Sequence, residues 1–195
     1  NPADVKAAEK MAKLYDQIKI DNPNLNKAKI HDLNVFLSRL LFCYFAEDTE
    51  IFPKGSFTSS VASHTNVNGS DLNSYLDRLF AVLNTQNRDK YPAYLQSFPY
   101  VNGGLLATKI ATPKFSHKSR KLLLECGELN WAEINPDIFG SMIQAVVNPD
   151  QRGELGVHYT SVENILKVIN PLFMDKLRSD FESGKTNKSK LEKLL

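Results

Sequence analysis

The tetrapeptide His158-Tyr159-Thr160-Ser161 places polar and aromatic side chains directly ahead of an apolar repeat that begins at Ile165. Thr160 and Glu163 have the Thr-x-x-Glu spacing of a capping box, in which the hydroxyl accepts a hydrogen bond from the Glu163 amide and the carboxylate reaches back. The free amides in the first turn of such a helix favour a carboxylate or another anion. The pattern therefore predicts a helix N-terminus that can bind an anionic ligand, and helix capping alone explains it equally well.

The other candidate motifs for metal or phosphate binding are incomplete. The four histidines have neither H-x-x-x-H spacing nor a C-x-x-C partner, so we expect no metal site. Ser183-Gly184-Lys185-Thr186 is similar to the end of a phosphate-binding loop, but Ser179 stands where the first glycine is required. A helix rather than a strand is also expected before it. We therefore interpret Ser183-Gly184 as a helix stop.

Asn170-Pro171-Leu172-Phe173 is similar to the Asn-Pro-Pro-Tyr/Phe signature of amino-methylating enzymes, which holds the exocyclic amine of a flipped base. Here Leu172 replaces the second proline and the preceding residues have a helical pattern, so a proline kink is the better interpretation. The sequence also has no G-x-S-x-G nucleophile elbow and no G-x-G-x-x-G turn. We therefore predict no catalytic residue in this chain.

The composition is that of a chain with a substantial core, because 42% of its 195 residues are hydrophobic. The formal charge of +2 does not indicate a strongly basic nucleic-acid binder, so any basic face must be local. Cys43 and Cys126 lie in apolar runs and are predicted to be buried free thiols, which favours a reducing, cytoplasmic compartment. Residues 35–46 carry Arg39 and are too short to span a bilayer, so no membrane segment is expected.

The two ends of the chain suggest a piece of a longer protein. The sequence opens with Asn1 and closes with the lysine-rich run 185–195, which stops on two leucines as though another element were starting. We therefore infer a fragment cut from a longer protein.

Apolar periodicity and capping residues predict the elements that must position any site. We expect helices over residues 3–20, 30–45, 70–83, 118–124 and 135–146, and a further helix from Thr160, kinked or restarted at Pro171. Residues 52–69 are predicted to form a loop, and residues 91–114 turns or a short hairpin in which Gly103 and Gly104 have positive φ. The predicted fold class is mainly α: an irregular multi-helix bundle with long loops and at most a short β-hairpin.

Four blocks, in this order, resemble one protein family. They are RLLFCYFAEDTEIF (39–52), FPYVNGGLL (98–106), WAEINPDIFGSMIQ (131–144) and RGELGVHYTSVENILKVINPLF (152–173). Together they resemble the segment of MmeI-like restriction-modification enzymes that joins an N-terminal endonuclease domain to a DNA adenine methyltransferase domain. The resemblance covers about residues 30–178, most of the chain.

The resemblance implies a helical spacer domain at 1–150 and a connector at 151–195 that leads into a methyltransferase domain lying outside this sequence. The parent protein would transfer a methyl group from S-adenosylmethionine to adenine N6 in double-stranded DNA, while a separate Mg²⁺-dependent nuclease domain hydrolyses foreign DNA. The fragment would be inactive and hold no cofactor itself. Its partners would be DNA and the two neighbouring domains of the parent.

The resemblance also implies roles for individual residues. His158, Tyr159 and Thr160 would lie near the methionine end of S-adenosylmethionine, although Ser161 stands where many related methyltransferases have proline. A second set, Arg152, Lys185 and Lys188, are candidates for contacts with the DNA backbone.

A second hypothesis belongs to a different class. The chain would be a stand-alone helical module that binds nucleic acid or another protein without catalysis, and its similarity to spacer domains would be architectural only. An intact small hydrolase is disfavoured, because no nucleophile, base and orienting group are arranged recognisably.

Overall fold

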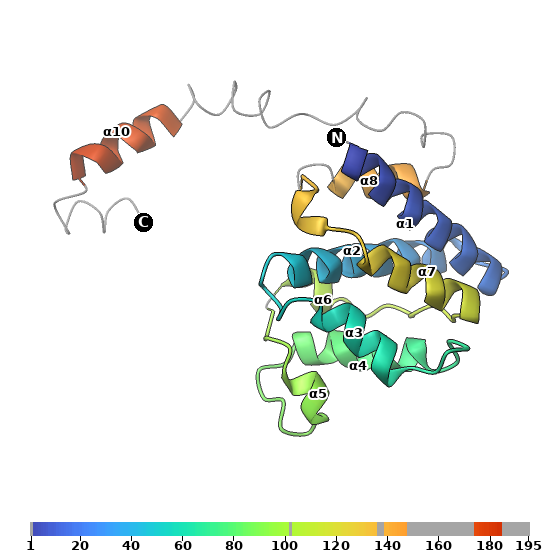
Figure 1. Ribbon diagram of the computed structural model, residues 1–195. Coiled ribbons are helices and arrows are strands. Elements are labelled where there is room, and N and C mark those ends of the chain that lie inside the picture. Colours follow the sequence, from blue (N-terminus) through green and yellow to red (C-terminus); the bar gives the residue numbers. More distant parts are fainter. Residues whose placement is uncertain (1, 102, 136–138, 148–173, 185–195) are drawn as a thin grey trace. The chain divides into compact units, whose positions relative to one another are not determined.

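The computed structural model describes residues 2–101, 103–135, 139–147 and 174–184, and all regular secondary structure in these ranges is helical (Figure 1). The chain forms two compact units, Asn1–Val157 and His158–Leu195. The predicted fold class, mainly α, is therefore confirmed. The predicted boundary at 150/151 falls within residues 148–173, which lie outside the described ranges, so that boundary stays a prediction.

The first unit is organised around α2 (Lys27–Asp48), which contacts α3 (Ser56–His64), α6 (Gly104–Ala107), the 3-10 helix η1 (Trp131–Glu133) and α8 (Phe139–Val147). The helix forms because apolar residues recur at spacings of three and four. Asn26 caps its N-terminus by accepting from the Lys29 amide at 2.9 Å. The prediction of a helix over 30–45 is confirmed, and the helix extends beyond these residues at both ends.

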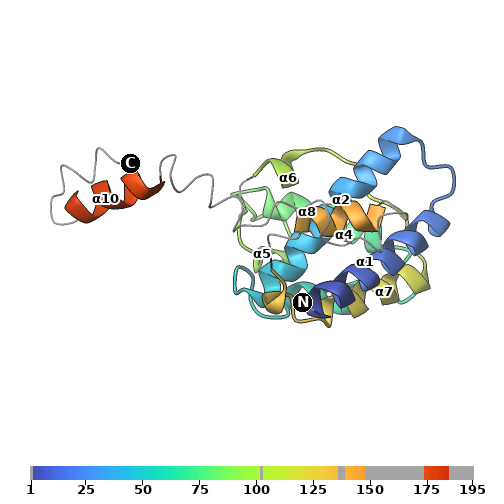
Figure 2. The same ribbon diagram turned by 90° about the horizontal axis from the view of Figure 1, so that it is seen from above.

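A second layer is formed by α1 (Pro2–Asp21), which packs against α7 (His117–Gly127) and α8. Figure 2 shows α1 and α7 side by side along one edge of the unit. A capping box of Ser116 and Ser119 starts α7, in which serine takes the place of the usual glutamate or glutamine. The sequence prediction starts this helix at residue 118, because Ser119 in place of glutamate or glutamine is a weak signal for a capping box.

On the other side of α2 lie α4 (Leu72–Leu83), which contacts α3 and α6, and the short α5 (Ala93–Gln96). The helix predicted over 70–83 is confirmed, and it has no side-chain cap at its N-terminus. Asp71 occupies the N-cap position without capping the helix, since its carboxylate accepts from the Asn66 amide at 2.8 Å. The carboxylate therefore closes the preceding turn.

The prediction of a loop over 52–69 is wrong, because residues 56–64 form α3. This helix buries only Phe57 and Val61, four residues apart, and its other positions are mostly serine, threonine and alanine. Two apolar residues are too few for a periodic signal. The stability of α3 comes from contacts with distant parts of the chain, described below.

The interpretation of Gly103 and Gly104 as positive-φ residues is also wrong. Gly103 is extended, with φ 163° and ψ 154°, and Gly104 begins α6. Positive-φ glycines occur instead at Gly55 and Gly69. At Gly69 a Cβ would also lie 2.7 Å from the Ser116 carbonyl oxygen, so that position excludes larger residues twice over.

In the second unit the described part is α10 (Asp175–Gly184), which ends at the predicted helix stop. The helices predicted from Thr160 to Pro171 lie outside the described residues. Within the described ranges, every helix is too short or too polar to span a bilayer.

Candidate functional site

The cofactor-binding candidates His158, Tyr159 and Thr160 lie outside the described residues. The same holds for the three DNA-backbone candidates, Arg152, Lys185 and Lys188. These assignments therefore stay predictions. The described residues instead show what the charged and aromatic members of the first three blocks do, and they form a pocket with two lysines and an aspartate in its lining.

Arg39, in the first block, fastens α2 to the second block. Its side chain is only 4% exposed; Nε donates to the Leu105 carbonyl at 2.9 Å and an Nη donates to the Thr108 carbonyl. The guanidinium carbon lies 5.2 Å from the centre of the Phe80 ring. Two carbonyls and an aromatic face therefore hold this cation, and its donors are directed at backbone of the same chain.

Burial lowers the pKa of Arg39 from its ordinary value, and the negative charge of Asp77 opposes that shift. Arginine stays protonated in proteins because its ordinary pKa is so high. The charge is thus retained inside the unit and compensated by carbonyl dipoles. We assign Arg39 a structural role at the α2–α6 contact.

Glu47, in the same block, caps α3 from a distance. One carboxylate oxygen accepts from the Thr58 amide at 2.9 Å and the other from the Thr58 hydroxyl. The N-cap residue of α3 is Gly55, which has no side chain to perform this task. The buried carboxylate of α2 therefore satisfies a free amide in the first turn of α3.

Burial raises the pKa of Glu47, while its hydrogen bonds from Thr58 partly oppose the shift and the neighbouring charge of Asp48 adds to it. A carboxyl group with a raised pKa is a candidate general acid or base. Here the side chain is 1% exposed and both oxygens are engaged by Thr58. It is closed to a substrate, and we interpret it as a helix cap.

The third block is fastened to α2 through Trp131, which is fully buried. Its backbone amide donates to an Asp48 carboxylate oxygen at 2.7 Å, and its indole N–H donates to the Cys126 carbonyl at 2.9 Å. Its ring stacks on Tyr44 with 5.2 Å between centroids, and the Tyr44 hydroxyl donates to the Leu123 carbonyl at 2.8 Å. The block is therefore tied to both α2 and α7.

The cysteines behave as predicted. Cys43 and Cys126 are buried and free, and burial raises the pKa of the Cys126 thiol to about 12. A thiol with such a pKa is neutral and unreactive at physiological pH. Neither cysteine is a candidate nucleophile.

A serine, a histidine and two tyrosines on α3, α4 and α5 contact one another. Ser60 Oγ lies 2.5 Å from the Tyr75 hydroxyl and 3.5 Å from His64 Nδ1, and the His64 ring stacks on Tyr94 at 3.9 Å. His64 Nδ1 also lies 3.0 Å from the Ser60 carbonyl oxygen, and no carboxylate among the described residues orients the ring. A serine–histidine mechanism needs such an orienting group. The group cross-links three helices.

Metal-ligating residues do not converge anywhere in the described ranges, where no group of three or more His, Cys, Asp or Glu side chains could hold an ion. A structural or catalytic divalent metal needs such a set. This part of the chain therefore presents no ligand set for a metal ion.

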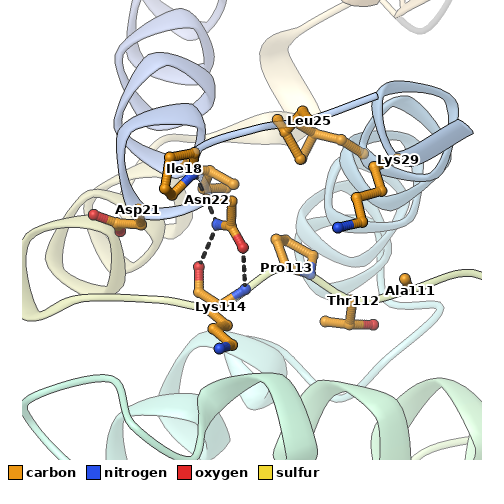
Figure 3. Close-up of a pocket in the computed structure, with 11 residues that line it drawn as sticks. Ile18, Asp21, Asn22, Leu25, Lys29, Ala111, Thr112, Pro113 and Lys114 are labelled. Carbon is orange, nitrogen blue, oxygen red and sulfur yellow. Dashed lines mark hydrogen bonds between the residues drawn. The ribbon is translucent and has the colours of Figure 1, made fainter. Parts of the chain in front are cut away.

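The pocket lies between the end of α1, the α1–α2 loop, the first turns of α2 and the extended residues 111–114 (Figure 3). Its volume is about 370 Å³. The apolar part of the lining comes from Ile18, Pro23, Leu25, Leu33 and Pro113, and the charged part from Asp21, Lys29 and Lys114. Figure 3 shows the Lys29 ammonium directed toward Pro113 and Asn22.

Asn22 holds the two walls of this pocket together. Its amide nitrogen donates to the Lys114 and Ile18 carbonyls, both at 2.8 Å, and its amide oxygen accepts from the Lys114 N–H at 2.9 Å. Asp21 accepts from the Ser116 amide and hydroxyl at 3.0 and 2.8 Å. The side chains of Asn22 and Asp21 are thus engaged by hydrogen bonds within the fold, and Lys29 contributes an ammonium group to the lining.

Among the described residues, neither Lys29 nor Lys114 has an ion-pair partner within 4.0 Å. The pocket offers positive charge and apolar walls without a nucleophile or base, so it is suited to binding an anion rather than to catalysis. Sequence reasoning missed it, because its walls come from segments far apart in the chain and nothing distinguishes these lysines from others.

The chain is similar to parts of longer known proteins. Residues 31–106 match the family model of the MmeI helicase spacer domain. Over its whole length the chain is 53% identical to DNA methyltransferase A of Bacillus subtilis (strain 168), of which it covers 22%.

A solved structure is also similar to this chain in fold and sequence. The type IIL restriction-modification enzyme MmeI, whose structure is of a complex with DNA, is 42% identical in sequence and matches with a TM-score of 0.75. The match covers 97% of this chain and 25% of that chain. The chain thus spans about a quarter of the length of the relatives that it matches.

Proposed function

We propose that the chain is the helical spacer and connector of a bifunctional DNA restriction-modification protein, on the premise that residues 31–106 match the model of the MmeI helicase spacer domain. Its task is mechanical. It holds a nuclease domain and a methyltransferase domain at a fixed separation, so that the place of cleavage is set relative to the recognised DNA sequence.

The observation that carries this proposal is that polar side chains of the first block form hydrogen bonds to the backbone of the second and third blocks. Arg39 and Asp48 are directed at backbone groups of distant blocks, at Leu105 and at Trp131. Residues of this kind are available for catalysis when they face a cleft, but here they lock α2 to its neighbours. A spacer needs such rigidity, because a flexible one would blur the distance that it sets.

The parent reaction follows from the same premise. We propose methyl transfer from S-adenosylmethionine to adenine N6, by a domain that contributes most of the cofactor site, and DNA hydrolysis by a separate Mg²⁺-dependent nuclease. His158, Tyr159 and Thr160 would contribute one wall at the methionine end of the cofactor. The relative named as a DNA methyltransferase and the relative named as a restriction-modification enzyme support this assignment.

The alternative of a stand-alone binding module with only architectural similarity is disfavoured. Identity of 53% over the whole chain extends well beyond shared architecture. The gene that encodes the chain discriminates further: a glycine-rich strand-turn-helix and an Asn-Pro-Pro-Tyr/Phe motif downstream of Leu195 support the spacer, whereas a stop codon at that point supports the module.

A methylation assay tests the inactivity of the chain itself. The 195-residue chain is incubated with duplex DNA and S-adenosylmethionine labelled on its methyl group, and label in the DNA is counted. We expect none above background, because no catalytic set is present in the described residues and the main cofactor wall belongs to another domain. Robust incorporation would contradict the proposal.

A further inference from the structure

Six exposed lysines gather where two distant segments meet. Residues 19–32 and 109–118 contain six lysines and two aspartates, whereas the remainder of the chain has more acidic than basic residues, 20 against 18. We call these two segments the lysine seam. Its lysines, all exposed, are Lys19, Lys27, Lys29, Lys109, Lys114 and Lys118.

Hydrogen bonds hold the two segments together, and both aspartates accept such bonds from backbone amides of the other segment. Asp32 accepts from the Ala111 amide at 3.0 Å, Asp21 accepts from Ser116, and Asn22 bonds to both backbone groups of Lys114. Each aspartate is thus fixed against a backbone amide. The lysines between them are left with a local excess of positive charge, which the charge of the whole chain conceals.

The pocket gives the lysine seam a recessed centre. Lys29 and Lys114 belong to its lining on opposite segments, and Figure 3 shows the Lys29 ammonium directed toward Pro113 and the Lys114 side chain extending away from Lys29. The volume of about 370 Å³ admits a phosphate group with part of the attached sugar. Pro23, Leu25 and Pro113 form apolar walls against which a sugar can lie. The first turn of the 22-residue α2 also opens beside the pocket, and its positive end favours an anion.

We propose that the lysine seam binds the phosphate backbone of double-stranded DNA, with Lys29 at the phosphate nearest the pocket and Lys114 contacting the backbone from the other segment. This inference rests on the proposed function, which brings duplex DNA to the parent protein. Exposed lysines on two adjoining segments can each contact a phosphate, and contacts of this kind position DNA without reading its sequence. The spacer then also supports the DNA between the two domains that act on it.

The test compares two matched pairs of substitutions in the full 195-residue chain. K29A/K114A removes one lysine from each segment of the lysine seam. The control, K6A/K54A, removes two exposed lysines elsewhere. Lys6 lies about 22 Å along α1 from Asp21, and Lys54 follows the far end of α2, about 33 Å from its start. Both pairs change the net charge equally.

Binding to a fluorescent duplex of mixed sequence is measured between about 25 and 200 mM salt, a range in which phosphate contacts weaken strongly. K29A/K114A should weaken binding several-fold at low salt and reduce the slope of log K against log salt by about 2, roughly 0.9 per lost contact. The control should leave the slope unchanged. If both pairs of substitutions weakened duplex binding equally, net charge alone would explain the effect and the proposal would be overturned.

A mononucleotide is tested beside the duplex. Saturable binding of the mononucleotide that K29A/K114A abolishes, without an effect on the duplex, would show a small-anion site and overturn the assignment to DNA. Absence of any duplex binding by the unsubstituted chain would also overturn it. Neither result touches the spacer proposal, which the methylation assay and the flanking gene sequence test separately.

Discussion

The carboxylate of Glu47 receives both the backbone amide and the hydroxyl of Thr58, so a residue of α2 caps the N-terminus of α3. The side chain is 1% exposed, and the bond crosses between two helices of the unit. The sequence around either residue carries no signal for the other. The cap therefore links the existence of α3 to the prior packing of α2.

Replacing Glu47 with glutamine should change how stability depends on pH. Burial raises the folded-state pKa of Glu47 above the ordinary 4.5, so between 4.5 and that raised value the folded state binds more protons than the unfolded state. The stabilising contribution is complete below pH 4.5 and is lost as pH rises. The stability of the unsubstituted chain relative to E47Q should therefore fall as pH increases from 4.5 toward neutrality.

Urea unfolding at several pH values, followed by fluorescence of Trp131, measures this difference. Trp131 is the single tryptophan of the chain and is fully buried, so its emission reports the unfolding of this unit. E9Q, at an exposed position of α1, controls for the loss of one charge. A relative stability that rises with pH over this interval would refute the assignment.

Gly127 is required by the same contact. A Cβ on this residue would overlap Thr58 Oγ1 and lie 2.9 Å from Thr58 Cγ2. G127A should destabilise the chain by roughly 1–3 kcal/mol, because Thr58 would have to move away from Glu47. G103A is the matched control, since a Cβ there would meet no atom within 4 Å and the backbone is extended. A midpoint unchanged in G127A would show that α3 and α7 can separate freely.

Arg39 should tolerate neither truncation nor lysine. R39A removes two hydrogen bonds and the contact with Phe80, and we expect a loss of roughly 2–4 kcal/mol, the range of a buried network. R39K keeps the charge but has no planar fork to reach both Leu105 and Thr108, so it should be intermediate. Urea midpoints of the two variants decide this, and equal stability of R39K and the unsubstituted chain would contradict the role of the fork.

The helices that could be predicted are those whose apolar residues recur over three or more turns. In α2 and α4 this periodicity determined the helix, because one continuous face had to be buried. α3 has only Phe57 and Val61 on its buried face and is capped by Glu47 of α2. The helix is therefore stabilised by tertiary contacts, and its own residues do not predict it.

The pocket shows the same limit for a site. Lys29 and Lys114 look like ordinary solvated lysines when each is considered in its own segment. They become neighbours of one pocket only because Asn22 and Asp32 bond to the backbone of residues 111–114. Amide and carboxylate side chains carry no signal for such a bond in a single sequence. The resemblance to the MmeI family could be recognised because it rests on ordered blocks, whose meaning does not depend on knowing these contacts.

Tyr44 provides a last prediction, in which a hydrogen bond and a titration act together. Its hydroxyl donates to the Leu123 carbonyl at 2.8 Å, in a fully buried position. Y44F should cost about 1–2 kcal/mol at neutral pH, because that carbonyl loses its donor, while the ring keeps its stacking on Trp131. The emission spectrum of the folded chain should therefore stay the same.

At alkaline pH the stability difference between the unsubstituted chain and Y44F should become smaller. Burial raises the folded-state pKa of Tyr44 well above the ordinary 10.0, so above pH 10 the folded state retains a proton that the unfolded state releases. The unsubstituted chain then loses stability with rising pH, and Y44F lacks this loss. Urea midpoints of both chains at about pH 7 and at about pH 10.5, half a unit above the ordinary tyrosine pKa, measure the effect. A gap that narrows supports the buried hydroxyl, whereas a gap that stays constant or widens would mean that solvent reaches it.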